Sequence, residues 1–370
     1  MKIKRINELK KMAEFDQKTK KQVVFFGCDL DCDEQYESIQ EKSASRDKIN
    51  QEPYQSVLSL LDKGGADYSF TTLGSIPVPD WLGPFPDVDI SELTSERFVN
   101  FIDEDGCREY CQKVERLVYN NILPNIPCMI AVDHSLTGGV LKSVFNYYGD
   151  NKISLVVMDS HTDAIPMQVM ADTIHYDLET NPHSIYDKND KLLYNRTNSY
   201  NASSFIYHLI QEDLIDPNHV YIVGVSDYPP KNAFKIKDKR VKNYVDAYVS
   251  LKRKGVKIAT KEECLKYPSR LKQMFKKIET PYIYLSIDMD IGAKNALDGV
   301  RFRNWKGLSE KQINKLITSL LDTIKPEQLI GMDLTEFNPR RAGSGINGNA
   351  DNTYLIAAKL LTRIISKVSN

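Results

Sequence analysis

The feature that most constrains the fold is a series of short apolar runs separated by longer, charged segments. Several runs are apolar at almost every position, which is typical of strands covered on both faces of a parallel sheet. The clearest runs are Gln22–Cys28, Asp67–Ile76, Pro127–Val132, Ile153–Met158, Val220–Val225, Val256–Thr260, Tyr282–Ile287 and Leu329–Leu334.

Amphipathic segments lie between these runs. Glu104–Asn121, Ser309–Ile324 and Asp351–Val368 place apolar residues near a helical period. Alternating strands and helices predict an α/β protein with a mainly parallel, about eight-stranded sheet and helices on both faces.

The composition limits which partners and which cellular compartment are expected for this chain. The net charge of -1, with 27% charged residues, does not favour nucleic acid or an anionic membrane as the main partner. No apolar run approaches the roughly 18 residues of a membrane span. Residues 1–21 predict a basic, partly helical extension without the apolar core of a secretory signal, and residues 22–370 a single domain. We therefore expect a cytoplasmic protein.

The six cysteines fit the same compartment, where thiols stay reduced. Two pairs have C-x3-C spacing, which differs from the usual C-x2-C of zinc knuckles. We interpret all six as structural.

Two segments interrupt the alternation. Pro77–Asp89 holds four prolines and predicts an irregular surface loop. Ala164–Ser204 has little periodicity and is read as a long loop insertion. Because loops longer than about 15 residues are usually functional or disordered, we expect a lid or a wall of a substrate pocket.

Metal-capable side chains follow four of the apolar runs. In an extended segment, alternate residues point the same way, so Asp159, His161 and Asp163 aim at one point. A surface loop could carry this pattern by chance. Ligands of a parallel sheet bind beyond the carboxyl ends of its strands, however, and three other runs end in His134, in Asp288 and Asp290, and in Glu336. So many acidic and imidazole groups at one rim suit a pair of divalent ions such as Mn²⁺.

These motifs resemble those of the arginase/agmatinase (ureohydrolase) family. The resemblance is carried by Asp133–Gly139 (DHSLTGG), Asp159–Ala164 (DSHTDA), Ser286–Asp290 (SIDMD) and Asp333–Pro339 (DLTEFNP), and it covers roughly residues 22–365. It implies a three-layer α/β/α fold, two Mn²⁺ ions per chain (or other divalent transition metals) and a guanidino-type substrate.

The resemblance also implies roles for individual residues. One ion would be held by His134, Asp159, Asp163 and Asp288, and the other by Asp159, His161, Asp288 and Asp290. A hydroxide bridging the ions would attack the guanidinium carbon, releasing urea and an amine. Glu336 would pair with the guanidinium, and Asp163 would accept a proton from the metal-bound water.

The sequence departs from the family pattern around the substrate. Asn201, a candidate substrate contact, stands where family members often carry a histidine, and asparagine can hydrogen-bond but cannot shuttle a proton. His175 or His183 could replace it, although a histidine in a loop is more often just solvated. Asp227 is a candidate contact for a substrate amine. The basic, aromatic loop Arg301–Lys306 could bind a substrate carboxylate, or be a solvated loop with a buried Trp305.

The sequence therefore predicts a binuclear manganese hydrolase that cleaves a C–N bond of a small guanidino compound or of arginine within a peptide. Family members often form homo-oligomers. The alternative is a catalytically inactive relative that binds metal or ligand. A deacetylase-type amidohydrolase is weaker, because its adjacent histidine pair is missing.

Overall fold

The computed structural model describes residues 21–44, 52–63, 70–184, 186–343 and 351–369. The predicted helical character of the N-terminal extension falls on residues 1–20 and lies outside this part of the chain.

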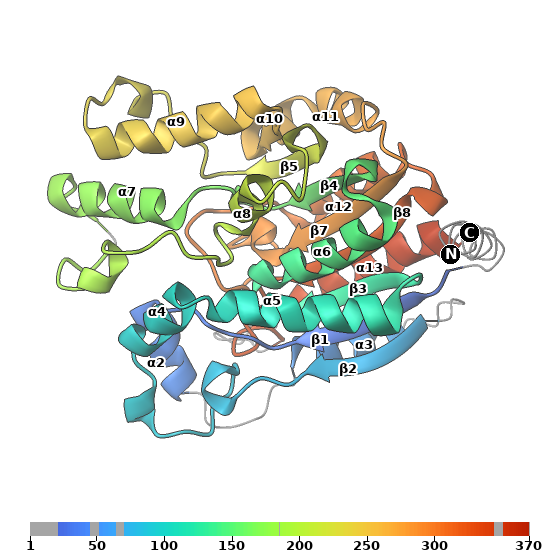
Figure 1. The fold of residues 1–370 in the computed structure, drawn as a ribbon, viewed down its shortest axis with the longest axis horizontal. Coiled ribbons are helices and arrows are strands. Elements are labelled where there is room, and N and C mark those ends of the chain that lie inside the picture. The colour runs from blue at the N-terminus through green and yellow to red at the C-terminus, as the bar shows by residue number, and fades with distance from the viewer. Residues whose placement is uncertain (1–20, 45–51, 64–69, 185, 344–350, 370) are drawn as a thin grey trace, which may run out of the picture.

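The core of the described chain is one parallel sheet of eight strands in the order β2-β1-β3-β8-β7-β4-β5-β6 (Figure 1). The predicted α/β fold class is confirmed, and each strand overlaps one of the predicted runs. The strands are β1 (Val23–Cys28), β2 (Phe70–Ile76), β3 (Ile126–Ala131), β4 (Ile153–Met158), β5 (Val220–Val225), β6 (Lys257–Thr260), β7 (Tyr282–Asp288) and β8 (Leu329–Thr335).

The three predicted helices are present. Glu104–Asn121 forms α5 followed by a π-helical turn at Val118–Ile122, Ser309–Ile324 contains α12, and Asp351–Val368 contains most of α13. The described helices are α2 (Tyr36–Ala44), α3 (Pro53–Lys63), α4 (Ser95–Asp103), α5 (Gly106–Leu117), α6 (Thr137–Tyr148), α7 (Met167–Thr180), α8 (Phe205–Gln211), α9 (Lys239–Lys254), α10 (Lys261–Lys266), α11 (Pro268–Phe275), α12 (Glu310–Leu321) and α13 (Thr353–Ser369).

Local sequence explains where several helices begin and end. The helix α12 begins at a capping box, in which Ser309 and Gln312 satisfy each other's backbone N–H groups. The helix α9 is capped at its N-terminus by Asp238, whose side chain accepts from Arg240 N, and at its C-terminus by Gly255, whose φ of 112° is accessible to glycine.

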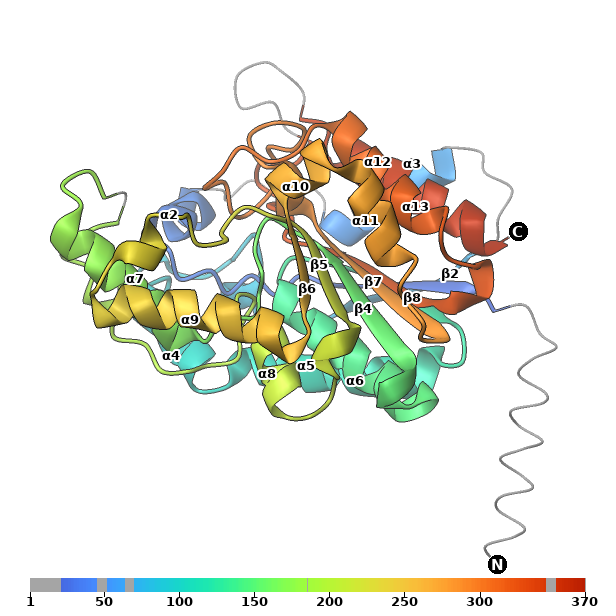
Figure 2. The same cartoon turned by 90° about the horizontal axis from the view of Figure 1, so that it is seen from above.

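The helices cover the two faces of the sheet (Figure 2). Successive residues of β1 point to opposite faces: Val23 and Phe25 pack in one core with α3, α11, α12 and α13, and Val24 and Phe26 in the other with α4, α5, α6 and α8. Because both faces are covered, the strands read as continuous apolar runs.

One predicted loop is partly helical. The helix α7 occupies residues 167–180 of the segment 164–204, which the sequence predicts to be a loop. Its buried residues are only Met167, Ala171 and Leu178. Val169 and Tyr176 lie on the opposite side of the helix, so the helical period is weak in the sequence. The described residues contain no helix long and apolar enough to cross a membrane.

Candidate metal centre

The predicted ligands lie at the carboxyl ends of four strands that are neighbours in the sheet, β3, β8, β7 and β4. His134 follows β3, Glu336 follows β8, Asp288 and Asp290 lie at the end of β7, and the segment 159–163 follows β4. The sheet order thus brings together residues that are far apart in the sequence. The backbone N–H of His134, for example, donates to Glu336 Oε1 at 2.9 Å across a separation of 202 positions.

Each metal motif is also a local turn that orients its carboxylates. Asp159 Oδ1 accepts from the backbone N–H of His161 at 2.7 Å, and Asp288 Oδ1 accepts from that of Asp290 at 2.7 Å. Such Asx turns are formed by an aspartate and the residue two positions later. Each turn uses one carboxylate oxygen and leaves Oδ2 for another partner.

The first cluster of ligand atoms surrounds His134. Its Nδ1 lies 2.7 Å from Asp163 Oδ2, 3.2 Å from Asp288 Oδ2 and 3.6 Å from Asp159 Oδ2. All four residues are buried, and their ligand atoms lie within 4.8 Å of one another. These are the residues that the family resemblance assigns to one ion.

A second cluster consists of Asp159, His161 and Asp290. His161 Nδ1 lies 2.8 Å from Asp290 Oδ2 and 3.6 Å from Asp159 Oδ1. Asp159 belongs to both clusters, as expected of a bridging ligand, whereas Asp288, the other predicted bridge, groups only with the first. We call the six residues of both clusters the ligand cluster: His134, Asp159, His161, Asp163, Asp288 and Asp290.

The ligand cluster holds more negative charge than its own side chains can balance. Burial and the neighbouring carboxylates raise the pKa of Asp159 and of Asp288 well above the usual range. Burial lowers the pKa of His134, but the nearby carboxylates of Asp163 and Asp288 raise it by more, so this pKa is also raised. Protonation is one way to relieve this repulsion, and a bound cation is another.

The residues present fit divalent ions. His134 Nδ1, Asp159 Oδ2 and Asp290 Oδ2 are buried and have no hydrogen bond of good geometry within the described chain, although each lies near other members of the ligand cluster. Carboxylate oxygens together with imidazole nitrogens suit Mn²⁺, Fe²⁺ or Zn²⁺.

Two residues that were not predicted from the sequence orient His134. Ser286 Oγ donates to Asp333 Oδ1 at 2.6 Å, so it accepts from His134 Nε2, 2.8 Å away. This bond places the ring proton on Nε2 and leaves Nδ1 free to bind a cation. A signal was available, because Ser286 lies two positions before Asp288 and therefore on the same face of the strand.

Asp163 and Glu336, the predicted catalytic residues, both have a left-handed backbone, with φ of 48° and 64°. The carbonyl oxygen of Asp163 accepts from Ile206 N at 2.9 Å, and Glu336 N donates to Val132 O at 3.0 Å. Non-glycine residues adopt this conformation only when their surroundings hold them there, often at functional sites. Burial raises the pKa of Glu336 to about 8.

The two other residues predicted to contact the substrate, Asp227 and Asn201, form hydrogen bonds with the surrounding loops. Asp227 is buried, and its Oδ2 accepts from Thr162 N at 3.3 Å, while Oδ1 has no partner among the described residues. Asn201 Oδ1 accepts from Ser203 Oγ and Ser204 Oγ at 2.9 and 3.1 Å, just before α8. In the structure, the side chains of Asp227 and Asn201 therefore both accept hydrogen bonds from neighbouring residues of the chain.

The histidines considered as replacements for Asn201 lie elsewhere. His175 is on α7, where its ring stacks on Tyr194 with centroids 4.5 Å apart and its Nε2 lies 3.1 Å from Glu179. His183 is exposed in the loop after α7. His183 fits the expectation of a solvated loop histidine, whereas His175 lies on a helix and is engaged with Tyr194 and Glu179.

The loop Arg301–Lys306 lies beside the ligand cluster. The ring centroid of His161 is 5.9 Å from that of Phe302 and 5.3 Å from that of Trp305. The prediction of a buried Trp305 is wrong, since 39% of this residue is exposed. An aromatic side chain that is half open and next to a ligand histidine can contact a substrate.

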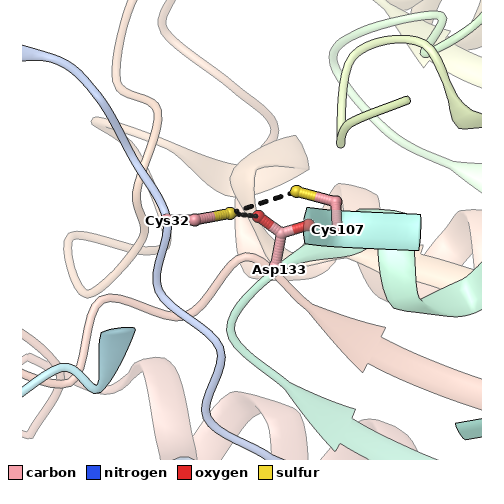
Figure 3. Close-up of side chains that lie close together, drawn as sticks. All are labelled: Cys32, Cys107 and Asp133. Carbon is pink, nitrogen blue, oxygen red and sulfur yellow. Dashed lines mark hydrogen bonds between the residues drawn. The ribbon is translucent and has the colours of Figure 1, made fainter. Parts of the chain in front are cut away.

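A third group of metal-capable side chains, Cys32, Cys107 and Asp133, lies nearby (Figure 3). Cys32 Sγ is 3.4 Å from Cys107 Sγ and donates to Asp133 Oδ2 at 3.2 Å. Asp133 Oδ2 is already paired with Arg301 Nη1 at 2.9 Å, and that positive charge opposes a cation. We interpret this group as a hydrogen-bonded thiol pair. All six cysteines are buried and free, which fits the structural role predicted for them.

Solved structures of known proteins share this fold. They include the agmatine ureohydrolase of Thermoplasma volcanium, with 16% identity, a TM-score of 0.54 and coverage of 96% of this chain and 93% of that chain. Proclavaminate amidino hydrolase from Streptomyces clavuligerus has 16% identity, a TM-score of 0.56 and coverage of 94% and 92%. Arginase from Bacillus subtilis has 18% identity, a TM-score of 0.55 and coverage of 94% and 99%.

Sequence comparison assigns the chain to a family. No curated protein sequence matches the chain. The model of the arginase family, however, matches residues 21–366, which is nearly the whole chain and includes all the metal motifs. The family resemblance predicted from those motifs is therefore confirmed, and the chain belongs to the arginase family.

Proposed function

We propose that the protein is a binuclear manganese hydrolase that cleaves a C–N bond of a guanidino-type substrate, a small molecule or an arginine within a peptide. The observation that carries the proposal is the pair of ligand groups that share Asp159 and are buried except for the partly exposed His161. When bound, two Mn²⁺ ions would supply a water of lowered pKa and stabilise charge that develops during hydrolysis.

The proposal assigns a role to each residue of the ligand cluster and to Glu336. His134, Asp159, Asp163 and Asp288 would hold one ion, and Asp159, His161, Asp288 and Asp290 would hold the other. Asp163 accepts a proton at its carboxylate, next to His134 Nδ1 at 2.7 Å. Glu336 accepts an N–H group of the substrate at Oε2, which is buried and has no partner within the described chain.

The surroundings of the ligand cluster are assigned to substrate binding. Asp227, through its unpartnered Oδ1, is proposed to contact a substrate amine, and Asn201 to contribute a hydrogen bond. Residues 22–370 are proposed to act as one domain, with the segment 164–204 as a wall of the substrate pocket.

Elemental analysis and an activity screen test the proposal. Protein purified with Mn²⁺ should contain about two transition-metal ions per chain, and replacing Asp159 with Ala should remove them. Guanidino compounds and arginine-containing peptides should then release urea or ammonia in a metal-dependent way. Protein that remains metal-free in excess Mn²⁺ would contradict the proposal.

The alternative is a relative that binds metal without catalysis. It is favoured by Asn201, whose side chain is engaged with Ser203 and Ser204 and cannot shuttle a proton. The same screen decides, because any turnover that Mn²⁺ restores to metal-free protein excludes this alternative.

A further inference from the structure

An arginine of the chain itself contacts the carboxylate proposed to bind the substrate. Arg301 Nη1 lies 3.3 Å from Glu336 Oε1, and the side chains of both residues are at most 4% exposed. Glu336 Oε1 also accepts from the backbone N–H of His134 at 2.9 Å. One oxygen of Glu336 is therefore fully engaged, and only Oε2 has no partner in the described residues.

The backbone holds Arg301 in this place. Its N–H donates to the carbonyl oxygen of Glu336 at 3.0 Å, and Val300 forms an antiparallel bridge with Phe337. Asn338 N donates to Gly299 O at 2.8 Å on the other side of the bridge. Because the segments of Arg301 and Glu336 are joined by these bonds, the two side chains start from fixed positions.

Other carboxylates also hold the guanidinium. The nitrogen that contacts Glu336, Arg301 Nη1, also lies 2.9 Å from Asp133 Oδ2, and Arg301 Nε lies 3.9 Å from Asp31 Oδ1. Both aspartates are buried. Moving Arg301 out of the site would leave Asp133 without its cation, which is costly for a buried carboxylate.

From this geometry we propose that Arg301 determines specificity by limiting Glu336 to one hydrogen-bonding oxygen. This inference rests on the proposed function. A carboxylate with two free oxygens binds a guanidinium through two parallel hydrogen bonds. Here Arg301 blocks one oxygen and adds a positive charge, so Glu336 binds a single N–H of an amidino or guanidino group.

The substrate class follows from this restriction. Free guanidinium and small guanidino cations bind weakly, since they lose one hydrogen bond and meet the charge of Arg301. A productive substrate therefore carries its amidino group on a larger body that contacts other parts of the site. Phe302 and Trp305, beside His161, offer aromatic surface for such a body.

Binding of guanidinium to the Mn²⁺-loaded full chain tests the inference. Titration calorimetry compares the wild type with Arg301→Met and with Arg303→Met, which removes the same charge from the same loop but pairs with Asp298 at 2.8 Å. Arg301→Met should bind guanidinium at least about tenfold more tightly than the wild type, because a charge-assisted hydrogen bond becomes available. Arg303→Met should stay within about twofold of the wild type.

Equal affinities of the wild type and Arg301→Met, at equal metal content, would overturn the inference. If Arg301→Met does not fold, a crystal structure of the wild type with guanidinium decides. The inference is supported if guanidinium binds Oε2 alone, or if it does not bind Glu336 and Arg301 keeps its place. The inference is overturned if guanidinium binds both oxygens of Glu336 and Arg301 is displaced. Failure of the proposed function is recognised separately, as wild-type protein that holds no Mn²⁺.

Discussion

Two groups of buried charge lie next to each other at the carboxyl edge of the sheet, and they are balanced differently. The ligand cluster has four carboxylates and two histidines. The neighbouring group, which we call the arginine cluster, has three cations facing three carboxylates: Lys42, Arg301 and Arg340 with Asp31, Asp133 and Glu336.

This difference in charge balance indicates which buried carboxylates lack a counter-charge from the chain itself. Asp31 lies 2.8 Å from Arg340 and 3.4 Å from Lys42, and these cations lower its pKa although burial raises it. In the ligand cluster, the pKa of Asp159 is raised instead, by burial and by Asp163. The chain supplies the counter-charge for the arginine cluster but not for the ligand cluster, where the proposed function assigns that charge to bound ions.

The largest effect is expected from breaking the balance of the arginine cluster. Asp31→Asn keeps the shape of the side chain but leaves Lys42 and Arg340 without their shared carboxylate. Removing one partner of a buried pair lowers the free energy of unfolding by about 3–5 kcal/mol. Urea denaturation of metal-free protein measures it. The control Asp322→Asn, whose partner Lys272 is at the surface, should cost less than about 1 kcal/mol. If Asp31→Asn lowered the free energy of unfolding as little as Asp322→Asn does, the view that the arginine cluster is balanced by its own ion pairs would be contradicted.

Mn²⁺ should stabilise the protein through the ligand cluster. At a free ion concentration of about a thousand times Kd, the free energy of unfolding should rise by about 4 kcal/mol. Asp288→Asn should abolish this rise, and in metal-free protein it should cause no loss, because it removes a charge that burial and Asp159 disfavour. Thermal unfolding with and without Mn²⁺ measures both effects. An undiminished response of Asp288→Asn to Mn²⁺ would rule out this site.

The bond that orients His134 should matter less than a ligand. Ser286→Ala removes the acceptor of His134 Nε2–H, and losing such a partner typically weakens metal affinity by about 10- to 100-fold. Competition with a chelator measures the affinity for Mn²⁺. Ser154→Ala is a matched control, since Ser154 is buried in the same sheet and bonds to Thr280. Equal affinities of the two variants would mean that Ser286 has no part in holding His134.

The smallest effect is a pH dependence of opposite sign in the two groups, with a slope of at most about 1.4 kcal/mol per pH unit for each carboxyl group. The raised pKa of Asp288 stabilises metal-free protein below its unfolded value of about 3.9, and this is lost as pH rises through the folded value. The lowered pKa of Asp31 stabilises the protein above about 3.9, and this is lost as pH falls.

Unfolding of metal-free wild type, Asp288→Asn and Asp31→Asn across the acidic range checks these signs. Relative to the wild type, Asp288→Asn should gain stability as pH rises, whereas Asp31→Asn should lose it. The same trend in both variants would show that the two groups do not differ in charge balance.

The strands and the individual ligand motifs were predictable from the sequence because each depends on a local pattern. An apolar run such as Ile153–Met158 is a buried strand wherever it lies in a parallel sheet. The turn that follows it, Asp159–Asp163, orients its own carboxylates through backbone hydrogen bonds. The helix α7 was not predicted, because its helical period is weak and its stability depends on packing against other elements, such as α9.

What the sequence by itself determined is therefore the sheet, the family and the side chains available to hold ions. Only the tertiary structure decided that Arg301 meets Glu336 and Asp133, 35 and 168 positions away, and that Ser286 links His134 to Asp333. These pairings depend on the order of strands in the sheet and on the path of the loop after β7. No local pattern encodes either, because the partners come into contact only when the chain is folded.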